Sequence, residues 1–390
     1  MDKRKKVVII SQPNLPIPDV KGGGIELLTR LIIEQNEIEK KYKLIVFSIY
    51  DEKAECTSRE YKYCKIIYIK MNKFSYMYGR ALNLLARIFG QDRVKNRIYY
   101  SRVFEKIKYI EGVMAVVFEG GPLVPIGKFR EYTNNLIYHS HVREWPGNKR
   151  YLYDKIITVS SFCQNDWLKM YPSQKIHILK NCIDSEKFVR QITNDEGKNI
   201  KSKLGIKEDD FVVVYVGRII PLKGVMELVE AWKYIDNKRI KLLIIGSLYN
   251  SFDVDISYSM MLEQIVQKDR RIVLAGYVDN GCLYKYLQLC DVQVVPTIGD
   301  EAAGLVAVEG MASGLPLICT NSGGLPEYSC SGESIVVERG SDLSQDIARE
   351  IIRIYDDSAI KDVAKNKRDI VIEEYSKQVY YRDFFRILEA

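Results

Sequence analysis

Two basic residues and two glutamates in the second half of the sequence have spacings that suit a charged ligand. Arg218 and Lys223 are five residues apart in the segment 217–224, between an apolar run and a helix-like pattern. Glu301 and Glu309 are eight residues apart in a second segment that also follows an apolar run. An arginine can hold two oxygens of a diphosphate while a lysine supplies a point charge. The first pair therefore indicates a diphosphate clamp; the alternative is two solvated surface cations.

The segment 296–316 predicts a helix with a phosphate site at its amino end. A strand ends at Pro296, a loop carries Glu301, and the helix opens near Gly304 with Glu309 in its first two turns. A helix N-terminus favours a phosphate, and a carboxylate beyond it can accept both vicinal hydroxyls of a ribose. The alternatives are a helix-stabilising acid, a surface glutamate, or the acid–base pair of a hydrolase, which leaves the neighbouring clamp unexplained.

Short apolar runs alternate with helix-length segments along the whole chain. Runs that are apolar throughout are typical of parallel strands covered on both faces. The pattern predicts two doubly wound α/β domains, in which ligands bind beyond the carboxyl ends of the strands. The predicted strands are 7–11, 44–49, 66–69, 114–118, 136–139, 156–160 and 176–179, then 211–216, 241–245, 271–275, 291–296, 315–320 and 334–338.

A polar, charged segment at 184–207 separates the two sets of strands. We therefore expect an N-terminal domain over 1–184 and a C-terminal domain over 185–372. The tail 373–390 has helical spacing and many aromatic residues, so it needs a surface to cover, and we expect it to pack back on the first domain.

Three glycines, 22–24, follow the first strand and precede a helical pattern. They allow backbone N–H groups to approach a phosphate, although a plain turn is an equal alternative. Leu27 stands where a dinucleotide fingerprint needs its third glycine. The segment 253–255 has the D-x-D spacing of a metal site but lies in a polar loop, not at a strand end.

Together these motifs resemble the GT-B glycosyltransferases of family 4. The matching features are G-R-x(4)-K-G at 217–224, the E-x(7)-E pair followed by E-G-M-A-S-G-L-P, S-G-G-L-P-E at 322–327, Gly-Gly before Ile25 and Glu26, His141 at a strand end, and Asn181 to Asp184 near the hinge. The resemblance covers most of the chain and is strongest in its second half. It implies two facing Rossmann-like domains with an interdomain cleft.

The resemblance also implies the roles of the site residues. Arg218 and Lys223 would hold the diphosphate, Glu309 the ribose, and Glu301 the hydroxyls of the donor sugar. The remaining donor contacts would come from His141, from backbone groups of Gly23, Gly24 and Val278, and from Gly304, Leu305 and Val306. Because three glycines follow one another, Gly22 is an alternative to Gly23 in the alignment with the family. His139 is likewise an alternative to His141, because the two histidines share one face of the strand. The family transfers with retention and without a metal, and the nucleotide-sugar is a co-substrate, so no cofactor is expected.

We therefore expect a retaining hexosyltransferase that uses a nucleotide-diphosphate sugar and an acceptor hydroxyl. A UDP-sugar is favoured by family frequency, and a saccharide or lipid-linked saccharide of the bacterial cell envelope or surface is the expected acceptor. The alternatives are an epimerase or phosphorylase on the same fold, or a non-catalytic coat or scaffold protein that keeps the donor cleft.

The formal charge of +7 is concentrated in one part of the chain. Residues 70–111 contain ten Lys or Arg and three Asp or Glu, an excess of seven. Within 70–108, an apolar stripe (Leu82, Leu85, Ile88 and Phe89) runs beside Arg80, Arg87 and Arg93. This stretch indicates either an anionic membrane surface or a core-packed helix with a solvated basic face. No recognition motif accompanies the charge, so no nucleic acid partner is expected.

The apolar runs are too short for a membrane span, and the N-terminus lacks the apolar region of a signal peptide. Eight dispersed cysteines without a C-x-x-C pair are typical of reduced thiols. We therefore expect a cytoplasmic protein, peripheral on the membrane if 70–108 binds lipid.

Overall fold

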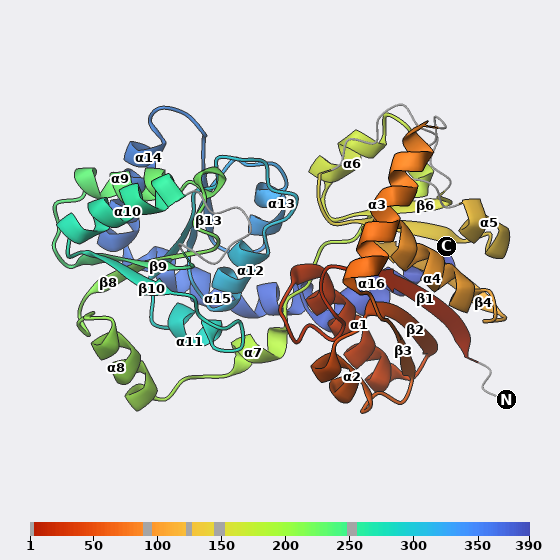
Figure 1. Ribbon diagram of the computed structural model, residues 1–390. Coiled ribbons are helices and arrows are strands. Elements are labelled where there is room, and N and C mark those ends of the chain that lie inside the picture. Colours follow the sequence, from red (N-terminus) through yellow and green to blue (C-terminus); the bar gives the residue numbers. More distant parts are fainter. Residues whose placement is uncertain (1–3, 89–95, 122–126, 144–152, 248–255) are drawn as a thin grey trace. The chain divides into compact units, whose positions relative to one another are not determined.

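The computed structural model describes residues 4–88, 96–121, 127–143, 153–247 and 256–390 (Figure 1). The chain forms two compact units, Met1–Asn181 with Lys377–Ala390, and Cys182–Ser376. The segment 253–255 with D-x-D spacing lies outside the described residues, as do Phe89 and Arg93 and the side chains of Leu85, Arg87 and Ile88.

The first unit contains a seven-stranded sheet in the order β3-β2-β1-β4-β5-β6-β7, and every paired neighbour is parallel. Its strands are β1 (Lys5–Ser11), β2 (Tyr42–Ile49), β3 (Cys64–Ile69), β4 (Val113–Glu119), β5 (Leu136–Ser140), β6 (Lys155–Thr158) and β7 (Ile176–Ile178). Its helices are α1 (Gly24–Glu39), α2 (Glu52–Ser58), α3 (Lys73–Ile88), α4 (Arg97–Ile107), α5 (Gly127–Tyr132), α6 (Ser161–Trp167) and α16 (Lys377–Glu389).

The second unit contains a six-stranded parallel sheet in the order β10-β9-β8-β11-β12-β13. Its strands are β8 (Phe211–Val216), β9 (Ile240–Ile245), β10 (Ile272–Gly276), β11 (Val292–Val295), β12 (Leu317–Thr320) and β13 (Ser334–Val337). Its helices are α7 (Ser185–Val189), α8 (Asn194–Lys203), α9 (Val225–Ala231), α10 (Ile256–Lys268), α11 (Leu283–Leu287), α12 (Leu305–Ala312), α13 (Leu325–Ser329), α14 (Leu343–Asp356) and α15 (Ser358–Glu374).

Strand β8 shows why its sequence is apolar throughout. Val213 and Tyr215 belong to a core shared with α9 and α14, whereas Val212 and Val214 belong to a second core shared with α12. Both faces of the strand are therefore covered, as parallel sheets require. The prediction of two Rossmann-like doubly wound α/β units is confirmed.

The tail is divided between the two units. The segment predicted as one helix over 373–390 is broken after Glu374, where α15 ends, and α16 begins at Lys377. Tyr375 between them is buried in a core of the second unit. Helix α16 packs on α1 in the first unit, where the ring of Phe385 stacks on that of Tyr42 at 3.8 Å between centroids.

Across the described parts of the chain, no helix combines the length and the apolar character that a bilayer span needs.

Candidate active site

The second unit has its topological switch point between β8 and β11, which are neighbours in the sheet. Ligands of open α/β sheets bind beyond the carboxyl ends of the strands at this point. The loop after β8 carries Arg218 and Lys223, and the loop after β11 carries Glu301. The topology thus brings Arg218, Lys223 and Glu301, which the sequence analysis predicted as site residues, to the same edge of the sheet.

Gly224 allows these two loops to touch. Its φ is +69°, and a Cβ there would lie 1.9 Å from the carbonyl oxygen of Pro296, so only glycine fits. The N–H groups of Ile298 and Gly299 both donate to the carbonyl of Leu222, at 3.1 and 3.0 Å. The close approach sets the position of Lys223, which stands between these contacts.

Lys223 and Glu301 form an ion pair between Nζ and Oε1. Their side chains are 23% and 18% exposed, so the pair is partly withdrawn from water. The hydroxyl of Thr297 donates to the same Glu301 oxygen at 3.1 Å. The free protein therefore keeps a cation and a carboxylate in contact at the switch point.

Arg218 is exposed and lies in the same loop as Lys223. The hydroxyl of Tyr215 donates to the Arg218 carbonyl at 2.7 Å. Burial raises the pKa of Tyr215, the Glu301 charge raises it further and the Arg218 charge lowers it. Both charged groups thus lie within electrostatic range of one phenol.

Helix α12 presents its amino end after the same loop. Gly304 is its N-cap, and a Cβ there would lie 2.6 Å from Leu325 Cδ1 of α13, so the helix start is packed tightly. The first intrahelical hydrogen bonds run from Ala307 and Val308 to the Gly304 carbonyl. The N–H groups of Leu305 and Val306 precede them and point outward from the helix start.

Glu309 lies on α12 and is half-buried. Burial raises its pKa to about 7, and the charge of Lys187 on α7 lowers it only in part. A carboxyl with this pKa is divided between protonated and ionised forms at neutral pH.

The glycine loop 321–327 supports the Glu301 loop. The N–H of Gly324 donates to the Glu301 carbonyl at 2.7 Å, and the hydroxyl of Ser322 donates to the Gly299 carbonyl. The segment 321–327 therefore holds the loop that carries Glu301 in place.

Val278 lies apart from these groups. It follows β10, the edge strand of the sheet, and packs against the core beside exposed Tyr277. Within the part of the chain that the structure describes, Val278 forms no hydrogen bond with the clamp residues, so its role stays a prediction.

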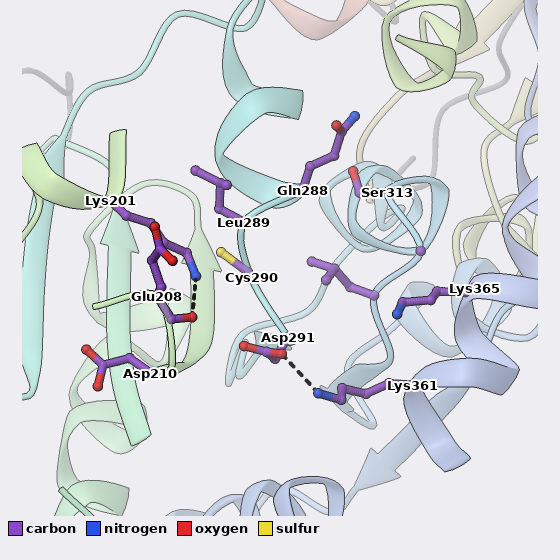
Figure 2. Close-up of a pocket in the computed structure, with 12 residues that line it drawn as sticks. Lys201, Glu208, Asp210, Gln288, Leu289, Cys290, Asp291, Ser313, Lys361 and Lys365 are labelled. Carbon is purple, nitrogen blue, oxygen red and sulfur yellow. Dashed lines mark hydrogen bonds and ion pairs between the residues drawn. The ribbon is translucent and has the colours of Figure 1, made fainter. Parts of the chain in front are cut away.

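A cavity of about 340 Å³ in the second unit is not this site (Figure 2). It is lined by residues that precede β8, β11 and β12, among them Asp210, Asp291 and Leu315, so it lies at the amino ends of the strands. Lys361 and Asp291 form an ion pair of 3.1 Å there. None of the predicted donor residues lines the cavity.

In the first unit the glycine run forms the start of α1. Gly22 and Gly23 have φ of +76° and +105°, whereas Gly24 is the first helical residue. The φ of Gly23 is one that other residues rarely adopt, so a substitution at this position would be strained. Burial raises the pKa of Glu26 to about 7.

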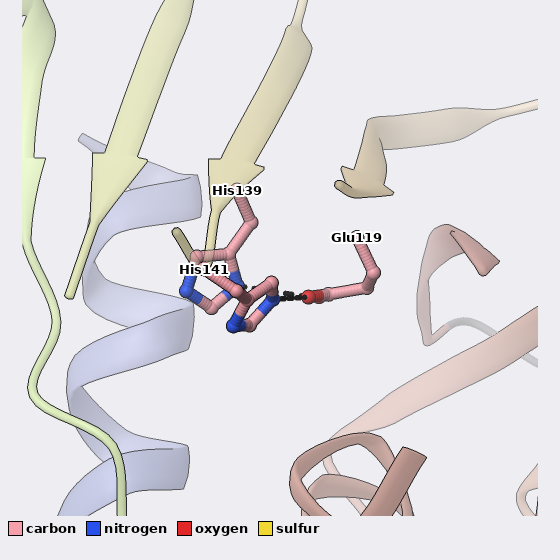
Figure 3. Close-up of side chains that lie close together, drawn as sticks. All are labelled: Glu119, His139 and His141. Carbon is pink, nitrogen blue, oxygen red and sulfur yellow. Dashed lines mark hydrogen bonds and ion pairs between the residues drawn. The ribbon is translucent and has the colours of Figure 1, made fainter. Parts of the chain in front are cut away.

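A carboxylate that our sequence analysis missed lies at the switch point of the first unit, between β1 and β4. Glu119 ends β4, and its Oε2 lies 2.6 Å from His141 Nε2 and 2.9 Å from His139 Nδ1 (Figure 3). The sequence signal was available: Glu119 is a charged residue closing an otherwise apolar strand.

Of the described residues, these three form the one group of histidine and acidic side chains close enough to hold a metal ion, with donor atoms within 4.8 Å. Their nitrogen–oxygen separations of 2.6 and 2.9 Å are hydrogen-bond lengths. These close contacts pair the two histidines with the carboxylate of Glu119.

Two parallel α/β units with charged loops at the switch point are the architecture of GT-B glycosyltransferases. A crystal structure of HepE from Anabaena in complex with UDP matches the chain with a TM-score of 0.74 and 16% identity, over 98% of this chain and 99% of that chain. This likeness shows the fold.

Sequence comparison gives the family of the second unit. Residues 196–377, which make up most of that unit, match the family described as "Glycosyl transferases group 1". The chain is 24% identical over 379 residues to the lipopolysaccharide 1,2-N-acetylglucosaminetransferase of Salmonella typhimurium, covering 95% of each chain. It is 30% identical over 254 residues to the capsular polysaccharide biosynthesis glycosyltransferase CapM of Staphylococcus aureus, covering 60% of this chain and 63% of that one.

Proposed function

We propose that the chain is a retaining hexosyltransferase that moves a hexose from a UDP-sugar to an acceptor hydroxyl in cell-envelope or surface polysaccharide synthesis. The observation that carries the proposal is the contact between Lys223 and Glu301 at the switch point of the second unit. The UDP bound by HepE supports the nucleotide, and the lipopolysaccharide and capsule relatives support the acceptor class.

The proposed roles follow from charge. Arg218 and Lys223 bind the diphosphate, the amino end of α12 adds the N–H groups of Leu305 and Val306, and Glu309 accepts the ribose hydroxyls. Glu301 accepts hydroxyls of the hexose, to which Gly23, Gly24 and His141 also contribute. Val278 receives the base through its backbone.

The leaving group is a nucleoside diphosphate, so its growing negative charge is the main quantity to stabilise. Preorganised cations and N–H groups do this at no cost in reorganisation. The acceptor hydroxyl attacks from the side of the leaving group and passes its proton to the departing phosphate oxygen. The C1–O bond to UDP breaks as the bond to the acceptor forms, and no protein base is needed.

A thermal-shift panel of UDP-, GDP- and ADP-sugars tests the donor. A ligand at 100 times its Kd stabilises the folded state by about 2.7 kcal/mol, so a UDP-hexose is expected to raise Tm by several degrees and the others less. A panel in which no UDP-sugar raises Tm contradicts the proposal. Conversion of the bound sugar without a new glycosidic bond would instead indicate an epimerase.

Helix α3 supports an anionic membrane as a further partner. Phe74, Met77, Tyr78 and Leu84 are 78%, 64%, 61% and 60% exposed, and exposed Arg80 lies among them. By contrast, α4 packs into the core through Tyr99, Tyr100, Val103 and Ile107. We propose that α3 alone lies on the lipid, with its apolar side chains inserted and its cations near the head groups.

Vesicle flotation tests this surface. The double variant Phe74→Ser, Met77→Ser is expected to lower partitioning onto phosphatidylglycerol vesicles at least tenfold, because each buried side chain contributes about 1.5–3 kcal/mol. Tyr109→Ser is the matched control, since Tyr109 is 77% exposed in the same unit but not on α3. A wild-type protein that never floats at low salt contradicts the proposal.

A further inference from the structure

The buried group of Glu119, His139 and His141 has a hydrogen-bonding pattern that fixes where its protons lie (Figure 3). The side chains are 2%, 0% and 5% exposed. Glu119 and His139 are paired in the register of β4 and β5, and His141 follows β5 directly. Both rings approach the same carboxylate oxygen, Oε2.

The carboxylate accepts the hydrogen bond from His141 Nε2, whereas His139 Nδ1 lies close to the same oxygen without hydrogen-bond geometry. Burial would raise the pKa of Glu119, but the two histidines outweigh it and lower the pKa to about 2, so the group is ionised. Burial and the neighbouring His139 lower the pKa of His141, so this ring is neutral at pH 7. A neutral imidazole has one N–H, and here it must be on Nε2, which faces the carboxylate.

His141 Nδ1 is then an unprotonated acceptor. It is buried and has no hydrogen-bond partner among the described residues. A buried acceptor without a partner costs free energy that a bound ligand can recover. A sugar hydroxyl is a donor of the right kind for this nitrogen.

We infer that Glu119 is a positioning residue that holds His141 in the Nε2–H tautomer, so that Nδ1 accepts a hydrogen bond from a hydroxyl of the donor sugar. The inference rests on the proposed role of His141 in donor binding. Glu119 acts through His141 and not by contact with the sugar, because the two histidine rings cover its carboxylate.

The wider surroundings define the controls. His141 faces Glu119 from β4, His139 from β5 and Glu26 from α1, and Asp19 adds its charge to Glu26. Since the pKa of Glu26 is about 7, it titrates in the range where activity is measured. A pH profile of a Glu119 variant must therefore be compared with that of Glu26→Gln.

Nuclear magnetic resonance of ¹⁵N-histidine-labelled protein tests the tautomer, because the chain has only three histidines. Variants at His139 and His177 assign the signals. Wild-type His141 is expected to show the Nε2–H pattern. In Glu119→Gln the amide can donate to Nε2, so the Nδ1–H form should become populated, whereas His139→Gln should leave His141 as in the wild type. An Nδ1–H pattern in the wild type, or an unchanged His141 signal in Glu119→Gln, overturns the inference.

Kinetics test the consequence. Glu119→Gln is expected to lower kcat/KM 10- to 100-fold, and the same change in a His141→Ala background should lower it less than twofold further. An equal loss in both backgrounds overturns positioning through His141. Full activity of His141→Ala contradicts the proposed function instead, and the tautomer result distinguishes the two failures. If Glu119→Gln does not fold, the wild-type spectrum and Glu119→Asp carry the test.

Discussion

Lys223→Ala is expected to lower kcat/KM by about two to three orders of magnitude, a loss of roughly 3–4 kcal/mol of transition-state stabilisation. The Lys223 ammonium is paired with Glu301, and the Gly224 contact holds its loop at the carboxyl ends of β8 and β11. In the proposed mechanism the diphosphate replaces this carboxylate as the partner of the ammonium, and its negative charge grows as the sugar departs. The interaction is therefore strongest in the transition state, so kcat should fall along with kcat/KM.

Lys233→Ala is the matched control. Lys233 is an exposed lysine of the same unit, 3.2 Å from Glu230, and it lies outside the switch-point loops. Its removal should leave kcat/KM within twofold of the wild type. Steady-state kinetics on both variants, with circular dichroism to verify folding, give the answer. Near-normal turnover by a folded Lys223→Ala protein rules out the clamp.

The strands were predictable because their chemistry is local. A run such as Phe211–Val216 is apolar at every position, and the structure buries one half of it in each of two cores. The tail was predictable only in part. The aromatic spacing continues through 373–388, but it does not encode that Tyr375 packs in one unit while Phe385 packs in the other.

The site was predictable where strand ends determine it. Parallel topology brings Lys223 and Glu301 together although they are far apart in the sequence. Glu119 was not recognised because its meaning depends on the pairing of β4 with β5, which brings it to His139. From composition, α3 and α4 were also predicted as parts of one basic stretch. In the structure α4 packs into the core, whereas α3 has exposed apolar side chains.

The two glutamates of the donor segment are expected to separate in a binding experiment. Glu309→Gln should weaken UDP binding about tenfold, because an amide accepts one ribose hydroxyl less well than a carboxylate accepts two. Glu301→Gln should leave UDP affinity within threefold of the wild type but lower kcat/KM for the UDP-sugar about 100-fold, because the proposed role of Glu301 is to accept hydroxyls of the hexose.

The pH dependence of UDP affinity tests the proposed role of Glu309 as the ribose ligand. The pKa of Glu309 is raised to about 7, so the carboxyl is protonated below this pH and ionised above it. Because the ribose hydroxyls donate to the ionised form, affinity should rise with pH through 7, by up to tenfold per unit on the acidic side. Calorimetry from pH 6 to 8 on the wild type and Glu309→Gln separates this rise from the titration of UDP itself, which both proteins share.

Equal losses of UDP affinity in the two glutamine variants, or parallel pH profiles for the wild type and Glu309→Gln, would show that the division of roles is wrong. A rise confined to the wild type, together with a Glu301→Gln variant that binds UDP but does not use the sugar, assigns one carboxylate to each half of the donor.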